Sequence, residues 1–386
     1  MNATKGRRGA GGRTAALALA VLAGALLCAA PPGLFCGCKP AQSPAAQAPD
    51  AGAGLRVEQD PAHPGRFTAR FETMSTEGAI LVCAPGEAQA RRMIAAALEP
   101  IHTVAAQMST YRADSEVSRL NRDGSSGPVA LSQGTMRVLD ESVNYTKLTG
   151  GAFDVTYAPL RTLWRAAQQE GRMPSQADIA RALDAVGYYK LVLTYAEDGG
   201  GTASFAAPGM EVDLGGIAKG YAVDLAAEAL IAAGAPSALV EIGGDMRAVG
   251  RREEWKIRVY DPRLDEHEPM FLRLSDAAVA TSGDYARYFE VAGRRLSHVI
   301  DPRTGLPVEG MSSVTVVAPT ATDADALSTA VSVMGPAEGL RLVDSRPGVE
   351  CMIMLRPAGE PGGGEEAVQV VFSKGFLALT EGGAER

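Results

Sequence analysis

The stretch MEVDLGGIAKGYAVD, residues 210–224, predicts a strand that ends at Asp213, turns at Gly215 and Gly216, and continues as a helix. In a dinucleotide-binding βαβ unit, a turn of this kind carries the pattern G-x-G-x-x-G. That pattern follows no predicted strand of this chain, and no Walker A sequence occurs. The other predicted strands and helices are mixed without a strict βαβ rhythm. We therefore predict the α+β class, with mixed β-sheets, packed helices and no Rossmann signature.

Hydrophobic periodicity locates the other elements. Alternating or apolar runs predict strands at 66–82, 191–195, 210–214, 238–242, 255–260, 278–281, 287–291, 295–300, 313–317, 349–355 and 368–372. Helical patterns run through 87–108, 132–149, 175–186, 216–233, 322–334 and 337–344. Ser132 and Ser175 are typical N-cap residues for two of these helices, and Gly234 is a typical helix end.

The N-terminal segment has the features of an export signal. A basic start precedes an uncharged run at 15–30 that is short for a transmembrane helix. The sequence LFCGCKP then places Cys38 after a glycine, which resembles a bacterial lipoprotein signal, whereas Cys36 follows the bulky Phe35. We predict a lipoprotein signal peptide at 1–37, acylation of Cys38, and an exported, membrane-anchored protein that faces the periplasm. An ordinary cleaved signal with incidental cysteines is the alternative.

The composition indicates a flexible tether followed by a globular body. Residues 38–65 are rich in Pro, Ala, Gly and Gln, and the body at 66–386 is long enough for one large domain or two joined ones. The net charge of −8 argues against a nucleic-acid partner. Cys83 and Cys351 lie in apolar runs, so we expect buried thiols rather than a disulfide or a metal pair.

The Gly-Gly turn at residues 215 and 216 is the first candidate for a ligand site. Glycines at such a turn let a ligand approach the backbone, and a helix N-terminus favours an anion. Lys219 lies in the first turn of the predicted helix, where a cation opposes the helix dipole. That unfavourable position indicates a partner, either a ligand phosphate or an aspartate. A tight turn with a solvated lysine is the alternative.

The helix predicted within TATDADALSTAVSVMG, residues 320–335, carries the second candidate. Asp325 and Thr329 are four residues apart and share one face, among small and apolar neighbours. A buried carboxylate beside a hydroxyl is a hard-oxygen set that suits Mg²⁺. Asp323 points elsewhere on the helix, so we expect it to cap the helix or to be solvated. A hydrogen-bonded core acid is the alternative for Asp325.

The stretch SHVIDPRTGLPVEG, residues 297–310, contains His298, one of four histidines in the chain. An Asp-Pro-x-x-Gly turn follows it, in which proline sets φ and glycine allows positive φ. No second His or Cys lies nearby in sequence, which is poor support for a transition metal. His298 suits proton transfer near neutral pH. A solvated hairpin that happens to contain a histidine is the alternative.

Two further segments have less specific signals. MSTYRADSEVSRLN, residues 108–121, is polar and rich in hydroxyls, and GGAFDVTYAPL, residues 150–160, places Phe153 and Asp154 after a Gly-Gly turn. An aromatic ring beside an acid is a plausible clamp for a base or ring system. Loop packing is an equally good interpretation of the same pair.

Together these segments resemble the ApbE family of flavin transferases, also called FAD:protein FMN transferases. The resemblance extends over residues 71–376 and rests on eight motifs in the same order. They are ETMSTEGAI, MSTYRADSEVSRLN, GGAFDVTYAPL, VDLGGIAKGYAVD, LVEIGGDMRAVG, ATSGDYARYFE, HVIDPRTGLP and ADALSTAVSVMG. Each motif is weak alone, but eight in sequence are specific. Members of the family are commonly exported, often as lipoproteins, which agrees with the N-terminal segment.

The resemblance implies an enzyme that binds FAD with Mg²⁺, transfers FMN to a threonine hydroxyl of an acceptor protein, and releases AMP. The acceptors would be subunits of membrane redox complexes. Mg²⁺ would be held by the Asp325 carboxylate, the Thr329 hydroxyl and the Gly216 carbonyl, and His298 would be the base or positioning group for the threonine. FAD would contact Met74, Tyr111, Ala152, Phe153, Asp154, Asp213, Lys219 and Ile300.

One position departs from the family pattern, because Ser75 stands where a glycine usually follows the methionine of the first motif. Two other functions remain open. One is a Mg²⁺-dependent FAD pyrophosphatase that gives FMN and AMP to water. The other is a lipoprotein that binds FAD without chemistry. The presence of Asp325, Thr329 and His298 favours an enzyme over a carrier, but the sequence does not separate transfer from hydrolysis.

Overall fold

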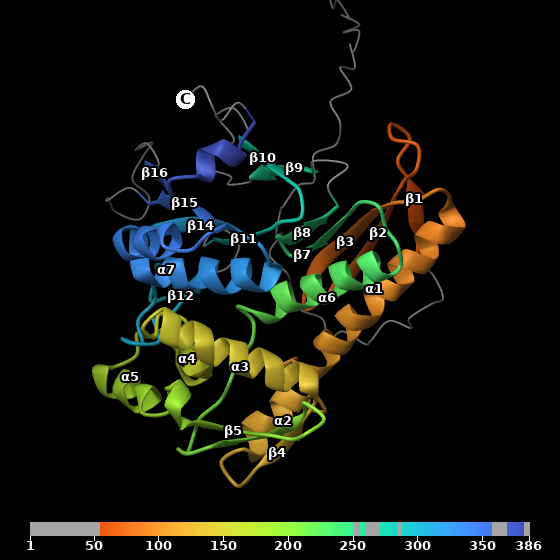
Figure 1. The fold of residues 1–386 in the computed structure, drawn as a ribbon. Helices are drawn as coiled ribbons and strands as arrows, with labels where there is room; N and C mark the ends of the chain where they lie inside the picture. The colour runs from red at the N-terminus through yellow and green to blue at the C-terminus, as the bar shows by residue number, and fades with distance from the viewer. Residues whose placement is uncertain (1–54, 251–254, 260–269, 284–287, 357–368, 382–386) are drawn as a thin grey trace, which may run out of the picture. The chain divides into compact units, whose positions relative to one another are not determined.

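A large antiparallel sheet forms the centre of the fold (Figure 1). The computed structural model describes residues 55–250, 255–259, 270–283, 288–356 and 369–381. The predicted signal peptide, Cys38 and most of the predicted tether lie outside these residues. The nine strands of the sheet are, in spatial order, β1 (Val57–Gln59), β2 (Arg66–Thr73), β3 (Thr76–Cys83), β7 (Ala238–Ile242), β8 (Asp245–Val249), β11 (Ala278–Gly283), β14 (Met311–Ala318), β15 (Glu350–Leu355) and β16 (Gln369–Phe372).

The sheet is covered on both faces. All eight residues of β14 are buried, as expected for a strand between β11 and β15 with packed layers above and below. Three helices cover one face (Figure 1). They are α1 (Glu87–Gln107), α6 (Ala218–Ala232) and α7 (Ala321–Asp344). On the opposite face lie the paired strands β9 (Trp255–Val259) and β10 (Met270–Leu274), whose Trp255 and Leu272 are buried in one apolar cluster with Leu239 and Met246 of the sheet.

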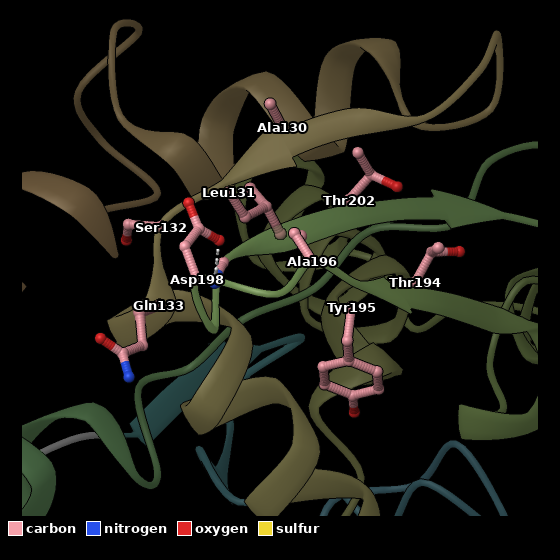
Figure 2. Close-up of a pocket in the computed structure, with 11 residues that line it drawn as sticks. Ala130, Leu131, Ser132, Gln133, Thr194, Tyr195, Ala196, Asp198 and Thr202 are labelled. Atoms are coloured by element: carbon pink, nitrogen blue, oxygen red, sulfur yellow. Dashed lines mark hydrogen bonds between the residues drawn. The ribbon is translucent and has the colours of Figure 1, made fainter.

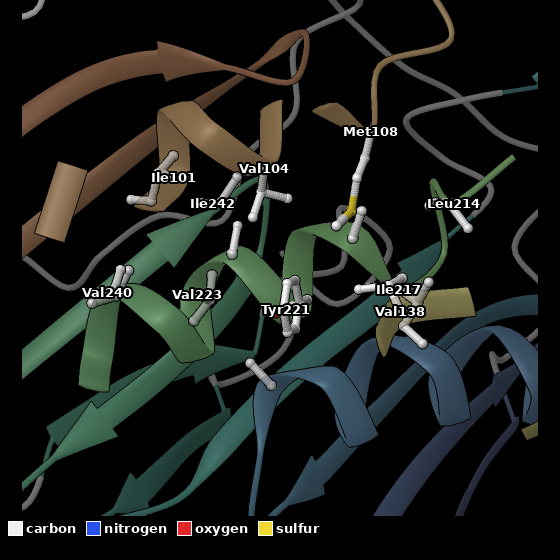
Figure 3. Packing of buried hydrophobic residues seen from close by; sticks show 14 of the residues in the cluster. Ile101, Val104, Met108, Val138, Leu214, Ile217, Tyr221, Val223, Val240 and Ile242 are labelled. Carbon is white, nitrogen blue, oxygen red and sulfur yellow. The ribbon is translucent and has the colours of Figure 1, made fainter. Parts of the chain in front are cut away.

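Helix α6 is central among the covering helices. It packs against α1, α7 and the strands β7 and β8, and nine of its fifteen residues are buried. Small alanines around the helix let these neighbours approach, and a helix without a polar face is expected to be buried. Figure 3 shows Tyr221 and Val223 of α6 beside Val104 of α1 and Ile242 of β7. This packing fixes the N-terminus of α6, where the Gly-Gly turn leads into the helix.

A further layer of shorter elements packs against α1 and α7. Its helices are α2 (Glu116–Asp123), α3 (Gln133–Leu148), α4 (Ala158–Glu170) and α5 (Gln176–Leu183). A three-stranded sheet has the order β4 (Val129–Leu131), β6 (Gly201–Phe205) and β5 (Leu191–Tyr195). The hairpin of β12 (Tyr288–Val291) and β13 (Arg294–Ser297) packs on α4. Helices gathered over an antiparallel sheet confirm the predicted α+β class.

Most predicted elements are present, and the two helical patterns predicted near the C-terminus form α7 with a break at Gly335 (φ 75°). The helices α2 and α4 were not predicted. A start signal for α4 is present, because a proline occupies its first turn and Gly171 ends it at φ 63°. At the N-terminal side, Val57–Gln59 pairs with β2, so ordered structure begins before residue 66, within the range predicted as a tether.

The predicted strand at 210–214 is wrong. This segment joins no sheet. Its backbone groups bond to partners from other parts of the fold. Asn121 of α2 donates to the Val212 carbonyl at 2.9 Å and accepts from the Val212 N–H at 2.7 Å. The Asp213 N–H donates to the Val155 carbonyl at 2.8 Å. The alternating sequence therefore did not show that this segment lacks a strand partner.

The two cysteines within the described residues are free thiols, as predicted. Cys351 is buried in β15, and burial raises the pKa of its thiol to about 12. Cys83 at the end of β3 is half-buried. Of the described helices, none combines the length and the apolar character that a bilayer crossing needs.

Candidate active site

Helices α6 and α7 cross at Gly220, and this crossing creates the site. A methyl group built on Gly220 would lie 2.2 Å from the backbone oxygen of Ala321, closer than any side chain allows. Only glycine permits the first turns of the two helices to approach so closely. The approach places Lys219 of α6 against Asp325 of α7, and the Gly220 N–H donates to Asp325 Oδ2 at 3.2 Å.

Lys219 lies between two buried carboxylates. Its Nζ donates to Asp245 Oδ2 at 2.5 Å and to Asp325 Oδ2 at 3.1 Å. Asp245 and Asp325 are 2% and 3% exposed, so neither charge is solvated by bulk water. The predicted need of Lys219 for a partner at the helix N-terminus is met by these two aspartates.

The charges of this cluster shift one another's protonation. Burial raises the pKa of Asp245 well above its ordinary value, and the neighbouring Asp325 raises it further, while Lys219 opposes both effects. Burial by itself would lower the pKa of Lys219, but the charges of Asp245 and then Asp325 outweigh it, and the pKa is raised. Two carboxylates facing one ammonium therefore form a cluster with an excess of carboxylate groups, which favours an additional cation.

Asp245 is a site residue that the sequence prediction missed. It is the first residue of β8 and follows the turn of Gly243 and Gly244, which have φ values of 58° and 94°. Two positive φ values in a two-residue loop are typical of tight hairpins and place Asp245 opposite Ile242 of β7. The signal in the sequence was an acid directly after an apolar strand and a Gly-Gly turn, in EIGGD.

Thr329 faces the Gly-Gly turn, as the prediction required. A methyl group built on Gly216 would lie 3.1 Å from Thr329 Oγ1, so the absence of a side chain leaves this hydroxyl open toward the turn. Ser282 of β11 lies beside it, with its Oγ 3.5 Å from Thr329 Oγ1 and 2.8 Å from Ser328 Oγ. Asp325, Thr329 and the turn are thus brought together from α6 and α7.

The donor set fits Mg²⁺ chemically. It combines a buried carboxylate and a hydroxyl beside the backbone of Gly216, in a cluster with excess negative charge. Mg²⁺ prefers few protein oxygen ligands, with substrate phosphates completing its shell. Among the described residues, no group of three or more His, Cys, Asp or Glu side chains is arranged to hold a metal ion. Asp323 does not belong to this set, because it accepts hydrogen bonds from Thr320 and Tyr145 at the start of α7.

Asp213, a predicted FAD contact, lies just before the turn and is 5% exposed. Its Oδ1 accepts from the Gly215 N–H at 2.8 Å, and its Oδ2 forms an ion pair with Arg161 of α4. Burial would lower the pKa of Arg161, but the charge of Asp213 outweighs it and raises the pKa. Arg161 was not identified from the sequence, because its helix was not predicted.

Tyr111, another predicted FAD contact, is 71% exposed on the segment between α1 and α2. Its hydroxyl accepts a hydrogen bond from Arg165 at 3.2 Å. Arg165 lies one helical turn after Arg161, so α4 links Tyr111 to Asp213. An exposed aromatic ring held beside a guanidinium is a suitable surface for stacking of a planar ligand.

The 152–154 segment, whose three residues are predicted FAD contacts, is buried. Ala152 and Phe153 are 1% and 4% exposed, and the Phe153 ring lies 3.4 Å from a methyl group built on Gly216. Asp154 accepts hydrogen bonds from Thr156 N–H, Thr156 Oγ1 and the Tyr188 N–H at 2.7 to 3.0 Å. The Asp154 carboxylate thus holds its own loop, and burial raises its pKa.

Met74 and Ser75 form the loop between β2 and β3, with φ values of 47° and 61°. Both residues therefore adopt the left-handed backbone that usually requires glycine. Met74 packs against the main apolar cluster, which also contains Ile217 beside the Gly-Gly turn. A glycine at the position of Ser75 would fit this tight loop without a Cβ at positive φ.

His298 directly follows β13 and is partly buried. The Asp301–Gly305 turn after it packs on α4, because Trp164 Nε1 donates to the Gly305 carbonyl at 2.8 Å. Ile300 is buried in the same apolar cluster as Trp164 and pairs with Pro307. This turn also meets the Gly-Gly turn before Phe153, since a methyl group on Gly151 would lie 3.4 Å from Cγ of Arg303.

A surface hollow of about 420 Å³ lies elsewhere, on the three-stranded sheet (Figure 2). Figure 2 shows Gln133, Tyr195 and Asp198 around it, and Asp198 accepts from the Gly200 N–H at 3.0 Å. None of the predicted site residues lines this hollow. The chemistry of the Lys219 cluster, rather than the size of a hollow, therefore identifies the candidate site.

Comparison with known proteins gives a consistent result. Residues 74–353 match the model of the ApbE family. FAD:protein FMN transferases of Vibrio cholerae serotype O1 and Haemophilus influenzae are each 38% identical to this chain, over 62% of the chain and 72% of the relative. The ApbE protein of Thermotoga maritima has a TM-score of 0.70 at 32% identity, with 81% of this chain and 99% of that chain covered. The flavin transferase ApbE of Vibrio cholerae has a TM-score of 0.68 at 31% identity, with 84% and 100% covered.

Proposed function

The chain belongs to the ApbE family, and we propose that it transfers FMN from FAD to a threonine hydroxyl of an acceptor protein, depends on Mg²⁺ and releases AMP. The enzyme class is that of its relatives, the FAD:protein FMN transferases. The observation that carries the proposal is the meeting of Asp325 and Thr329 with the Gly-Gly turn and Lys219. These groups combine negative oxygen donors for a metal ion with a cation and a helix N-terminus for phosphates.

The proposed reaction exchanges the phosphoanhydride bond of FAD for a phosphate ester bond to the threonine. The threonine oxygen bonds to the phosphorus on the FMN side of the pyrophosphate, the bond from that phosphorus to the bridging oxygen breaks, and AMP leaves with the bridging oxygen. The threonine proton passes to the imidazole of His298, because a hydroxyl is a weak nucleophile at neutral pH. The turn after His298 is anchored on α4 through Trp164, which supports a fixed position for the imidazole.

The Asp325 carboxylate, the Thr329 hydroxyl and the Gly216 carbonyl are the groups that would hold Mg²⁺. When bound, Mg²⁺ would neutralise charge that develops on the pyrophosphate oxygens. Lys219 would contribute a second positive charge to the same phosphates. The exposed ring of Tyr111, whose hydroxyl accepts a hydrogen bond from Arg165, would stack on a planar group of the nucleotide.

We further propose that the protein is exported, is anchored in a membrane by an acyl chain on Cys38, and faces the periplasm. The support is the signal-like sequence at 1–37 and the polar segment that follows it. This location would bring the enzyme to acceptor subunits of membrane redox complexes.

One assay tests the transfer. The purified protein is incubated with FAD, MgCl₂ and an acceptor that carries the flavinylation threonine, and the acceptor is weighed by mass spectrometry. We expect a gain of one FMN less one water, with one AMP released, and no gain when EDTA is present or the threonine is replaced by valine. Asp325→Asn should abolish the gain. The matched control Asp123→Asn, at an exposed ion pair with Arg122, should leave it unchanged.

The other outcomes distinguish the alternatives. Free FMN and AMP with an unmodified acceptor would mean that water is the acceptor and that the protein is an FAD pyrophosphatase. Binding of FAD without release of AMP would mean that the protein is a carrier. Either result would contradict the proposed transfer.

A further inference from the structure

Lys219 and a metal ion would compete for the same oxygen atom. Asp325 Oδ2 accepts from Lys219 Nζ at 3.1 Å, and Asp325 is the carboxylate proposed to hold Mg²⁺. Lys219 has a second and shorter contact, at 2.5 Å, with Asp245 Oδ2. The side chains of Asp245 and Asp325 are 3% and 5% exposed, against 17% for Lys219, so the three charges interact through protein rather than through water.

We propose that Lys219 is the internal counter-ion of Asp325 in the metal-free protein, and that Asp245 is a positioning residue which retains the ammonium when a divalent cation takes Asp325. This inference rests on the proposed function. It extends it by giving Asp245, and the contact of Lys219 with Asp325 in the metal-free protein, defined roles. The ammonium gives up only its longer contact and keeps its shorter one. The exchange therefore needs a small rotation of one side chain and no movement of the backbone.

The neighbours of each carboxylate support this division of roles. Asp325 Oδ2 also accepts from the Gly220 N–H at 3.2 Å, so Asp325 stays in place after the ammonium leaves it. Asp245 is the first residue after the tight Gly243–Gly244 turn between β7 and β8, which fixes its backbone. One carboxylate therefore belongs to α7 and the other to the sheet, with the lysine of α6 between them.

The exchange changes the net charge of the cluster. With all groups ionised, two carboxylates and one ammonium sum to −1, which disfavours a pyrophosphate anion. A divalent cation brings the sum to +1, which favours it. Lys219, released from Asp325, then has N–H groups available for phosphate oxygens. The protein would thus take up the anionic nucleotide efficiently only after the metal ion.

Metal binding to the FAD-free protein tests the proposal by isothermal titration calorimetry with MgCl₂. Lys219→Met removes the competing ammonium and should tighten Mg²⁺ binding about tenfold, the scale of one close charge pair of about 1.4 kcal/mol. Lys256→Met is the matched control, because Lys256 forms an exposed pair with Glu381 on β9, and it should leave Mg²⁺ binding unchanged. Unchanged or weaker binding by Lys219→Met would mean that the lysine organises the carboxylates instead, and would overturn the proposal.

Asp245→Asn separates positioning from direct ligation. With Lys219 present, this variant loses a nearby negative charge and leaves Asp325 as the remaining partner of the ammonium, so Mg²⁺ binding should weaken about tenfold or more. In the Lys219→Met background no ammonium remains to occupy Asp325, so only the lost negative charge of Asp245 counts. Asp245→Asn should therefore weaken Mg²⁺ binding clearly less in that background. Equal losses in both backgrounds would show that Asp245 acts on the metal ion without Lys219, which contradicts the proposed role.

Crystal structures with EDTA and with MgCl₂, both without FAD, provide a readout that needs no variant. We expect Lys219 Nζ beyond hydrogen-bond distance from Asp325 in the Mg²⁺ form, and within it from Asp245 in both forms. A retained contact with Asp325, or a wild-type protein that takes up no divalent ion without nucleotide, would refute the exchange. Because neither FAD nor an acceptor is used, a failed transfer assay and a failed exchange are distinguishable.

Discussion

At the scale of single residues, the position of Lys219 is explained by its partners. A cation in the first turn of a helix opposes the helix dipole, at a cost of about 0.3 to 1 kcal/mol. Two buried aspartates offset this cost. The local disadvantage of the lysine in the sequence was therefore a correct sign of an acidic partner.

His298 carries a prediction at the same scale. Replacement of His298 by alanine should reduce the rate of FMN transfer by about 10² to 10⁴, the usual contribution of a positioned proton acceptor. FAD affinity, measured by fluorescence titration, should change little, because the proposed role of the imidazole is toward the incoming threonine and not toward FAD. The matched control is His63→Ala, at an exposed histidine paired with Asp60, which should keep full turnover. Turnover of His298→Ala at the wild-type rate would remove this residue from the mechanism.

Ser75 carries a second residue-scale prediction. Its φ of 61° is unfavourable for a residue with a Cβ, so Ser75→Gly should raise the free energy of unfolding by up to about 1 kcal/mol, partly reduced by the greater freedom of glycine in the unfolded chain. Ser204→Gly in β6 is the control. There the same change removes a side chain from an extended strand, and it should lower stability by about 0.5 to 1 kcal/mol. Urea unfolding measures both, and a loss of stability at Ser75 would contradict the strain.

At the scale of elements, the crossing of α6 and α7 decides the geometry of the site. Asp325 and Thr329 share a face of α7, but they reach Lys219 and the Gly-Gly turn only because the helices touch at Gly220. The start of α7 is held there by Asp224 of α6, which accepts from the N–H groups of Ala321 and Thr322, each at 2.9 Å. Two helices thus supply the site, and one contact between them sets its dimensions.

Gly220→Ala tests this crossing. The added methyl group would lie 2.2 Å from a backbone oxygen, so the helices must separate, and we expect a loss of about 1 to 3 kcal/mol in unfolding free energy together with weaker Mg²⁺ binding. Gly134→Ala in α3 is the matched control. Its nearest neighbours would be 3.7 Å away, so alanine should be tolerated there and should stabilise the helix by up to about 1 kcal/mol. Equal effects of the two variants in urea unfolding would contradict the close contact.

At the scale of the whole molecule, the sheet serves as a platform on which distant segments meet. Of its central strands, β8 begins with Asp245 and β11 contains Ser282. The covering helices contribute Lys219 from α6, and Asp325 and Thr329 from α7. The shorter elements around α4 add Arg161 and support the turn after His298. The site is therefore built from several layers of one fold, and a stability defect in any of them should reduce activity.

The proposed anchor is also a property of the whole protein. Cys38→Ser should release the protein from the membrane fraction and abolish the mass of the acyl group, because the thiol proposed to carry the acyl chain is lost. Cys36→Ser should keep the protein in the membrane fraction. Cell fractionation with intact-mass measurement decides between them, and membrane retention of Cys38→Ser with release of Cys36→Ser would move the anchor to Cys36.

The sequence determined the class of the fold, most of the helices and the family. These depend on local periodicity, on caps and on short motifs, all of which lie within a few residues of one another. The pairing of Asp325 and Thr329 on one helix face is of the same local kind. Where a segment has an alternating sequence but no partner strand, as at 210–214, local periodicity had no means to show it.

Only the tertiary structure decided which groups face one another. Lys219 is separated by 26 residues from Asp245 and by 106 from Asp325, so no spacing in the sequence reveals their contact. The contact follows from the close crossing at Gly220 and from the tight turn before β8, which depend on the packing of helices on the sheet. Arg161 was hidden for the same reason, because its partner Asp213 lies 52 residues further along the chain. Packing between distant segments, rather than any local pattern, therefore completed the site.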